Sequence, residues 1–169
     1  MRTGFLLILA TLFTAFLTGC TPTESGGTDM TSQETSKELV GRWITGIWGR
    51  GNIELLQELA TEDYSYSYPG QEGLRGDAFV DYVHAIRSAI PDLDDTIEQQ
   101  VADGDTVVTR GTTRGTHQGS FGDIAPTGNL IEVSWVMFTR LEDGRIAEEW
   151  EIFDELALMK QLGAISMSE

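Results

Sequence analysis

The hydrophobic pattern of the chain changes at Pro91, and this change restricts the fold more than any other feature of the sequence. Before Pro91 the apolar residues recur at helical spacing, and the clearest set is Val40, Trp43, Ile44, Ile47 and Trp48. Beyond it, residues 130–141 and 146–153 alternate as strands do, and residues 93–101 form a more polar segment typical of an edge strand. Helices followed by an antiparallel meander predict an α+β fold, in which N-terminal helices pack on one side of a curved sheet.

Capping residues predict where the helices begin. Residues 35–38 (Thr-Ser-Lys-Glu) fit a capping box, so the first helix is expected to begin at Thr35. Asn52, Asp77 and Asp154 are predicted N-caps of three further helices, because a short polar side chain accepts hydrogen bonds from the free backbone N–H groups at a helix start. Each of these helices would then begin directly after its cap.

The first nineteen residues predict an export signal. Arg2 precedes an apolar run at residues 5–16, which would form a helix of about 18 Å, too short for a hydrocarbon core of about 30 Å. The segment ends in Leu17-Thr18-Gly19-Cys20, which resembles the lipobox of bacterial lipoproteins. This resemblance implies that residues 1–19 are removed and that Cys20 is lipidated. An ordinary secretory signal, in which Cys20 is incidental, is the alternative.

Residues 20–35 are rich in threonine and serine and are expected to form a flexible tether to one compact domain at residues 36–165. The lipid would be the only membrane attachment, and the domain would lie outside the cytoplasm. The chain has 27 acidic and 11 basic residues, a formal charge of −16, which excludes nucleic acid and disfavours anionic lipid headgroups as partners. With one cysteine and two histidines, no metal centre is expected.

Six short motifs occur along the predicted domain in the order of a known family. They are Pro91-Asp92-Leu93, Gly115-Thr116-His117-Gln118-Gly119, Pro126-Thr127-Gly128, Glu142-Asp143-Gly144-Arg145-Ile146, Glu149-Trp150 and Gln161-Leu162-Gly163. Together they resemble the SnoaL-like polyketide cyclases, also called ester cyclases, over residues 37–163. The resemblance implies the cone-shaped fold of nuclear transport factor two and ketosteroid isomerase, in which a strongly bent antiparallel sheet wraps a pocket.

The resemblance also implies a chemistry. Founding members of the family close a ring by intramolecular aldol condensation without metal or cofactor, so no cofactor is expected. Their acidic general acid/base, an aspartate on the last strand, falls on Glu151, and its assisting histidine falls on Met137. The carboxyl group is therefore kept, with one more methylene, and its partner is lost.

The pairing of the last two strands decides what surrounds Glu151. With a three-residue turn between the strands Glu151 would oppose Trp135, and with a two-residue turn it would oppose Val136. In either register Glu149 lies beside Glu151 against apolar neighbours, and two such carboxyls raise each other's pKa. Glu151 is therefore the predicted general base for removing a proton next to a carbonyl, assisted by Glu149. A solvated acidic edge that includes Glu148 is the alternative.

A largely apolar pocket for a small apolar or carbonyl ligand is expected around these acids. Its predicted lining residues are Trp135, Met137, Tyr66, Trp43 and Phe153. His117 precedes a glycine-rich loop at residues 118–129, where it would either donate a hydrogen bond to an enolate oxygen or pin the loop. His84 is expected to be a surface or packing residue.

Three functions remain open on these features. The first is cofactor-free acid/base catalysis on a small carbonyl compound. The second is a non-catalytic module that captures a small ligand at the cell surface, which the loss of the assisting histidine favours. The third is an interaction protein that fills its pocket with its own side chains and pairs through its sheet. A homodimer is compatible with a fold of this type.

Overall fold

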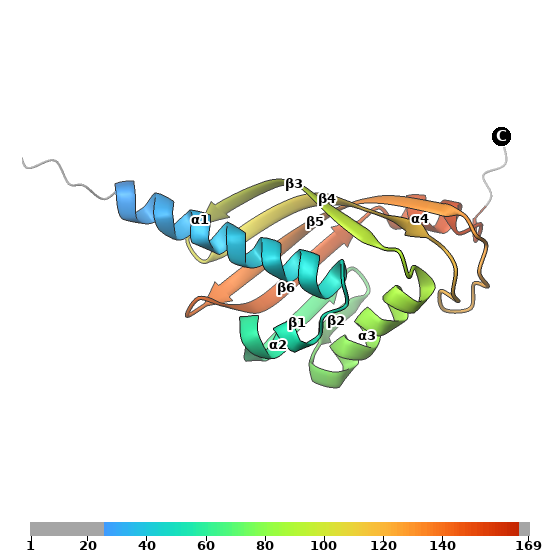
Figure 1. The fold of residues 1–169 in the computed structure, drawn as a ribbon, viewed down its shortest axis with the longest axis horizontal. Coiled ribbons are helices and arrows are strands. Elements are labelled where there is room, and N and C mark those ends of the chain that lie inside the picture. The colour runs from blue at the N-terminus through green and yellow to red at the C-terminus, as the bar shows by residue number, and fades with distance from the viewer. Residues whose placement is uncertain (1–25, 166–169) are drawn as a thin grey trace, which may run out of the picture.

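The computed structural model describes residues 26–165, which form a six-stranded sheet and its helices (Figure 1). In chain order the elements are α1 (Gly26–Trp43), the π-helical turn η1 (Ile44–Trp48), α2 (Glu54–Leu59), β1 (Ala60–Tyr68), β2 (Gln71–Leu74), α3 (Gly76–Ala89), β3 (Asp94–Asp103), β4 (Thr106–Thr116), β5 (Leu130–Glu142), β6 (Arg145–Phe153) and α4 (Glu155–Gln161). None of the helices in this described part is long and apolar enough to cross a membrane. The predicted signal peptide, Cys20 and the first part of the predicted tether lie outside the described residues.

Helix α1 begins at Gly26, so the prediction that it begins at Thr35 is wrong. Ser36 Oγ donates to the carbonyl oxygen of Ser32 at 3.0 Å, a contact one turn apart inside the helix. Because each residue added to an existing helix gains a hydrogen bond without a new nucleation cost, the packed C-terminal half of α1 extends toward the N-terminus. Residues 26–35, part of the predicted tether, are therefore helical.

One of the three predicted N-caps is confirmed. Asp154 caps α4, and its side chain accepts a backbone hydrogen bond of 2.9 Å in the first turn. The N-caps of α2 and α3 are Ile53 and Arg75, neither with a side-chain hydrogen bond, so the predictions for Asn52 and Asp77 are wrong. In both cases a glycine with a positive φ, a conformation that favours glycine, directly precedes the predicted cap.

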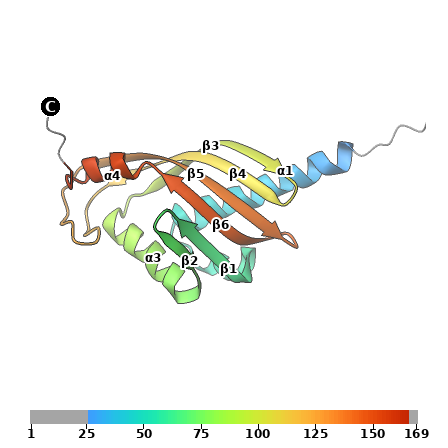
Figure 2. The same cartoon turned by 180° about the vertical axis from the view of Figure 1, so that it is seen from behind.

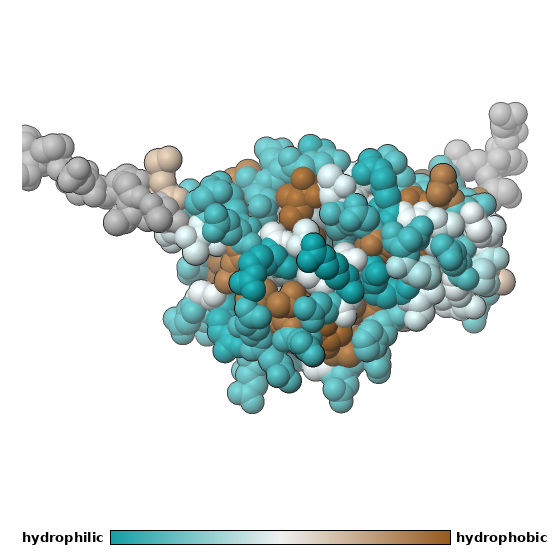
Figure 3. Space-filling model, viewed as in Figure 1, coloured by the Kyte–Doolittle hydropathy of each residue, from teal (hydrophilic) through white to brown (hydrophobic). Residues whose placement is uncertain are grey.

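The strands lie in the order β2-β1-β6-β5-β4-β3, which confirms the predicted α+β fold with a curved sheet. All neighbouring strands are antiparallel except β1 and β6, which run parallel. Strand β3 forms one edge, as predicted. Helix α1 crosses one face of the sheet in Figure 1, and Figure 2, the view from behind, shows strands β5 and β6 in front of α1, with α3 beside β2. Hydrophilic residues dominate the side of the molecule seen in Figure 3.

The space between the helices and the sheet is filled by aromatic rings. Trp43 of α1 is fully buried, and its ring lies 5.0 Å from that of Tyr64 of β1 and 6.3 Å from that of Phe79 of α3. The helical stripe predicted from the sequence is thus the side of α1 and η1 that faces the sheet. Burial of such large rings contributes more to stability than the local helix signals do.

The β5–β6 hairpin differs from both predicted registers. Its turn has two residues, Asp143 and Gly144, with φ angles of 49° and 73°. A bulge at Ala147 then shifts the ladder by one residue, so that Glu151 pairs with Met137 and neither with Trp135 nor with Val136. Paired residues share a face, and Met137 is buried on the inner face. The bulge therefore turns Glu151 toward the interior, where an unbulged two-residue hairpin would turn it outward.

Candidate active site

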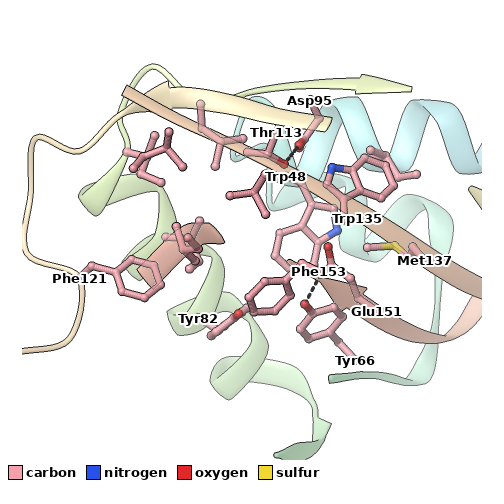
Figure 4. Close-up of a pocket in the computed structure, with 17 residues that line it drawn as sticks. Trp48, Tyr66, Tyr82, Asp95, Thr113, Phe121, Trp135, Met137, Glu151 and Phe153 are labelled. Atoms are coloured by element: carbon pink, nitrogen blue, oxygen red, sulfur yellow. Dashed lines mark hydrogen bonds between the residues drawn. The ribbon is translucent and has the colours of Figure 1, made fainter. Parts of the chain in front are cut away.

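A cavity of about 100 Å³ lies between the inner face of the sheet and the helices η1 and α3. Its walls are mostly apolar, and Figure 4 shows the polar groups that reach it. They are carried by Trp48, Tyr66, Tyr82, Asp95, Thr113, Trp135 and Glu151. An adjoining hollow of about 240 Å³ lies toward the 118–129 loop and α4 and shares Tyr82, Phe121 and Phe153 with the inner cavity. The two spaces together can hold a ligand longer than the inner cavity alone.

Glu151 extends from β6 into this cavity, and the Tyr66 hydroxyl donates a hydrogen bond to its Oε2. Burial raises the Glu151 pKa to about 8, the hydrogen bond from Tyr66 lowers it, and the charges of Glu149 and Asp95 raise it further. At pH 7 this carboxyl group is therefore mostly protonated. Glu151 therefore places an ionisable oxygen inside a mostly apolar pocket, as the sequence predicted.

Glu149 is fully buried beside the cavity and is not one of its lining residues. Its carboxylate accepts hydrogen bonds from Tyr64 Oη at 2.6 Å, Trp43 Nε1 at 2.9 Å and Thr139 Oγ1 at 3.4 Å. Burial raises its pKa to about 7, and these hydrogen bonds oppose the rise. The alternative of a solvated acidic edge is wrong for Glu149, whereas Glu148 is exposed.

His117 is buried at the end of β4 and does not line the cavity. Its Nδ1 lies 3.0 Å from Thr127 Oγ1, and its backbone N–H donates to the Asn129 carbonyl at 2.9 Å. Its backbone carbonyl accepts from Gly128 N–H, also at 2.9 Å. These contacts fit the second of its two predicted roles, in which His117 holds the 118–129 loop in place. His84 is exposed on α3.

Four of the five predicted lining residues, Tyr66, Trp135, Met137 and Phe153, line the cavity. The fifth, Trp43, does not, so that prediction is wrong. Its indole lies deeper in the core, where its N–H bonds to Glu149 and its ring packs on Tyr64 and Phe79. The position of Trp43 on the inner stripe of α1 is predictable, but how far its ring reaches depends on the elements opposite.

Asp95 of β3 is a second carboxyl group in the cavity, and the sequence analysis missed it. The Thr113 hydroxyl donates a hydrogen bond to its Oδ1. Burial raises the Asp95 pKa to about 6, against the opposing effect of that hydrogen bond. Alternation along the edge strand places Asp95 on the same face as Leu93 and Ile97, which is the sequence signal that could have found it.

The described residues contain no group of three or more metal-ligating side chains that could hold a metal ion. The two carboxyl groups of the cavity are those of Asp95 on β3 and Glu151 on β6, which are separated in the sheet by β5 and β4.

A model of the SnoaL-like polyketide cyclase family matches residues 38–162, almost the whole described domain. The chain belongs to this family. No curated protein matches the sequence.

Solved structures confirm the fold of this SnoaL-like domain. A protein from Jannaschia sp. CCS1 described as a SnoaL-like polyketide cyclase has 23% sequence identity and a TM-score of 0.73, covering 79% of this chain and 95% of that one. A protein of Acidithiobacillus ferrooxidans described as a polyketide cyclase has 26% identity and a TM-score of 0.68, over 78% and 96% of the two chains. IdmH of Streptomyces antibioticus, also described as a polyketide cyclase, has 28% sequence identity and a TM-score of 0.63, covering 76% of this chain and 98% of that one.

In this SnoaL-like domain, Met137 lines the cavity directly across the β5–β6 ladder from Glu151. The position expected for an assisting histidine therefore holds a thioether, which neither donates nor accepts protons. Among residues 26–165 no imidazole lines the cavity, since His84 and His117 both lie elsewhere. Any group that cooperates with Glu151 has to be sought among the other polar residues of the walls.

Proposed function

We propose that this SnoaL-like domain catalyses a cofactor-free acid/base reaction, of cyclase or isomerase type, on a small carbonyl compound. The observation that carries the proposal is Glu151, a carboxyl group inside an apolar cavity, hydrogen-bonded to Tyr66, with its pKa raised to about 8. A group that titrates near neutral pH can both give and take a proton there, which is what proton transfer next to a carbonyl requires.

The walls of the cavity support a substrate that is largely apolar. Desolvation strengthens the interaction of a carbonyl oxygen with the few polar groups present. A cavity of about 150 Å³ can hold benzene, so the inner cavity of about 100 Å³ suits a fragment of a few carbon atoms around the reacting carbonyl. The rest of the substrate would occupy the adjoining hollow of about 240 Å³. Similar structures described as polyketide cyclases support a carbonyl-rich substrate.

Hydrogen–deuterium exchange of butan-2-one tests this proposal. The probe is a small apolar ketone, and ¹H NMR in D₂O follows the loss of protons next to its carbonyl. We expect the protein to accelerate exchange and Glu151→Gln to reduce the second-order rate constant by about 100-fold or more. The matched control is Glu148→Gln, an exposed glutamate of the same strand, which should leave the rate unchanged. A Glu151→Gln variant with the parental rate would refute the role of Glu151.

Ligand capture without catalysis is the second candidate function. The observation that favours it is Met137 at the position expected for the assisting histidine. It predicts that butan-2-one shifts the NMR signals of cavity residues while its exchange rate stays at the buffer value. Binding with accelerated exchange would exclude this candidate.

We also propose that the domain is a lipoprotein, attached through Cys20 on the extracytoplasmic side of a membrane. The sequence Leu17-Thr18-Gly19-Cys20 after a short apolar run supports this. In a bacterial host, the mature protein should partition into detergent with a mass that includes acyl chains, and Cys20→Ala should not. A homodimer is a further proposal, supported by the exposed apolar side chains Phe138, Trp150 and Ile152 on the outer face of the sheet.

A further inference from the structure

Two carboxyl groups from distant parts of the sheet face the same small cavity. Asp95 comes from the edge strand β3 and Glu151 from β6, with strands β4 and β5 between them. The strands between them contribute Thr113 and Trp135 to the same wall. Figure 4 shows Asp95 and Glu151 with the indole rings of Trp48 and Trp135 beside them. A ligand that fills this cavity therefore meets both carboxyl groups.

Removal of a proton next to a carbonyl proceeds best when a base takes that proton while an acid supports the oxygen. Glu151 carries its proton in most molecules at pH 7, since burial raises its pKa to about 8. It is therefore suited to donate a hydrogen bond, and then its proton, to the carbonyl oxygen of the substrate. Asp95 has a pKa raised only to about 6 and is mostly ionised at the same pH. Different environments thus give the two carboxyl groups different protonation states, as acid and base need.

The surroundings of Asp95 explain why it stays the more acidic of the two. The Thr113 hydroxyl donates to it, and the positive charge of Arg87 lowers its pKa. The indole of Trp135 also lowers the pKa of Asp95, while the neighbouring charge of Asp94 raises it. Two of the three favourable groups, Thr113 of β4 and Trp135 of β5, lie on the two strands nearest to β3, so the sheet fixes their positions.

The surroundings of Glu151 keep its proton in place. Its titratable neighbours in the described part of the chain are Tyr64, Tyr66, Tyr82, the buried Glu149 and Asp95 itself. Burial raises the pKa of all three tyrosines well above its ordinary value, so they stay neutral. The negative charges of Glu149 and Asp95 both oppose ionisation of Glu151.

Two buried indole N–H groups beside the pair make no well-formed hydrogen bond in the described part of the chain, although each lies close enough to a carboxyl group, Trp135 to Asp95 and Trp48 to Glu149, to lower its pKa. Nε1 of Trp48 and Nε1 of Trp135 are buried and make no hydrogen bond of ordinary geometry within residues 26–165, although both rings line the cavity. Buried donors are nearly always paired in folded proteins. A ligand with carbonyl oxygens would supply acceptors in this part of the molecule. This geometric observation also indicates an oxygen-bearing ligand.

We propose that Asp95 is a second catalytic residue of this cavity, acting as the base while Glu151 acts as the acid. This inference rests on the proposed function. The bond between hydrogen and the carbon next to the carbonyl breaks, and the proton passes to the Asp95 carboxylate. The electron pair left on carbon forms a C=C bond, the carbonyl π pair moves to oxygen, and oxygen takes the proton of Glu151. The product is an enol, with Asp95 protonated and Glu151 ionised.

The test measures butan-2-one exchange from about pH 5 to about pH 9 for the parent protein and for Asp95→Asn, Asp94→Asn and Glu151→Gln. Asp94 is the matched control, since it is exposed and adjacent on the same strand. We expect a bell-shaped profile for the parent, with limbs near 6 and near 8. Asp95→Asn should lose about 100-fold or more in rate together with the lower limb, and Asp94→Asn should keep the limb and most of the rate.

An Asp95→Asn variant with the parental rate and lower limb would overturn the inference, and the proposed function would stand if Glu151→Gln were inactive. If the parent protein does not accelerate exchange, both the proposed function and the role of Asp95 as the base are contradicted. Should Asp95→Asn fail to fold, Asp95→Ala with added formate gives the same answer, because formate can replace the missing carboxylate. Rate recovery with formate in Asp95→Ala, absent in Asp94→Ala, supports the inference. A folded Asp95→Ala variant that keeps the parental rate without formate contradicts it.

Discussion

Replacement of the buried Glu149 should change how the stability of the protein depends on pH. The folded state raises the pKa of this group from 4.5 to about 7 through burial. Because the folded protein then holds the proton more tightly than the unfolded chain, the stabilising effect is complete below about pH 4.5. It is lost as the pH rises through 7. At about 1.4 kcal/mol per pKa unit, this shift lowers the free energy of unfolding by about 3 kcal/mol between these limits.

Glu149→Gln removes the titration but keeps an acceptor oxygen for Trp43 and Tyr64. We expect the variant to be close to the parent in stability near pH 5 and more stable by up to about 3 kcal/mol near pH 8. Urea unfolding followed by tryptophan fluorescence across this range measures the difference. Glu148→Gln is the control and should follow the parent at every pH. If Glu149→Gln and the parent differ by the same amount at pH 5 and pH 8, the buried carboxyl does not titrate as argued.

Two further predictions concern the frame around the cavity. Asp154→Ala removes the side-chain cap of α4 and should lower the free energy of unfolding by about 1 kcal/mol in urea titrations; a variant as stable as the parent would contradict the capping role. Thr127→Val removes the hydroxyl that contacts His117 Nδ1 and should cost about 1 kcal/mol, with faster amide hydrogen exchange in the 118–129 loop and an unchanged rate of butan-2-one exchange. Loss of catalysis without faster amide exchange would instead support a chemical role for His117.

The fold class was predictable because it depends on local periodicity. The helical stripe of Val40, Trp43 and Ile47 and the alternation of β5 and β6 are short-range patterns, and both are present as expected. The family motifs added the curvature and the pocket, and the family model and the structure confirm them. The cap at Asp154 was predictable for the same local reason.

The strand register was not predictable in the same way. The bulge at Ala147 depends on how β6 meets β5, and nothing in the residues around it sets an extra residue apart from an ordinary strand position. The conclusion that Glu149 and Glu151 share one face survives, because two residues of spacing preserve a common face whatever the register. The bulge decides that this face is the inner one. Which residues oppose them had to come from the structure.

How deeply each side chain of the site is buried could not be predicted from the sequence either. Trp43 and His117 lie on the expected elements, but Trp43 bonds to Glu149 and His117 holds a loop, since the groups that contact them come from distant segments. Asp95 shows the opposite case. Its alternation with Leu93 and Ile97 was visible, but the polar character of the edge strand favoured a solvated face, and only the packed structure places the carboxyl in the cavity.

The most direct test of the account is the titration of the Glu151 carboxyl carbon by ¹³C NMR, assigned by comparison with Glu151→Gln. Burial of this group beside Tyr66 predicts a midpoint near 8 that moves when butan-2-one is added. A midpoint near the ordinary value of 4.5, unchanged by the ketone, would mean that Glu151 is solvated and would contradict the proposed chemistry of the cavity.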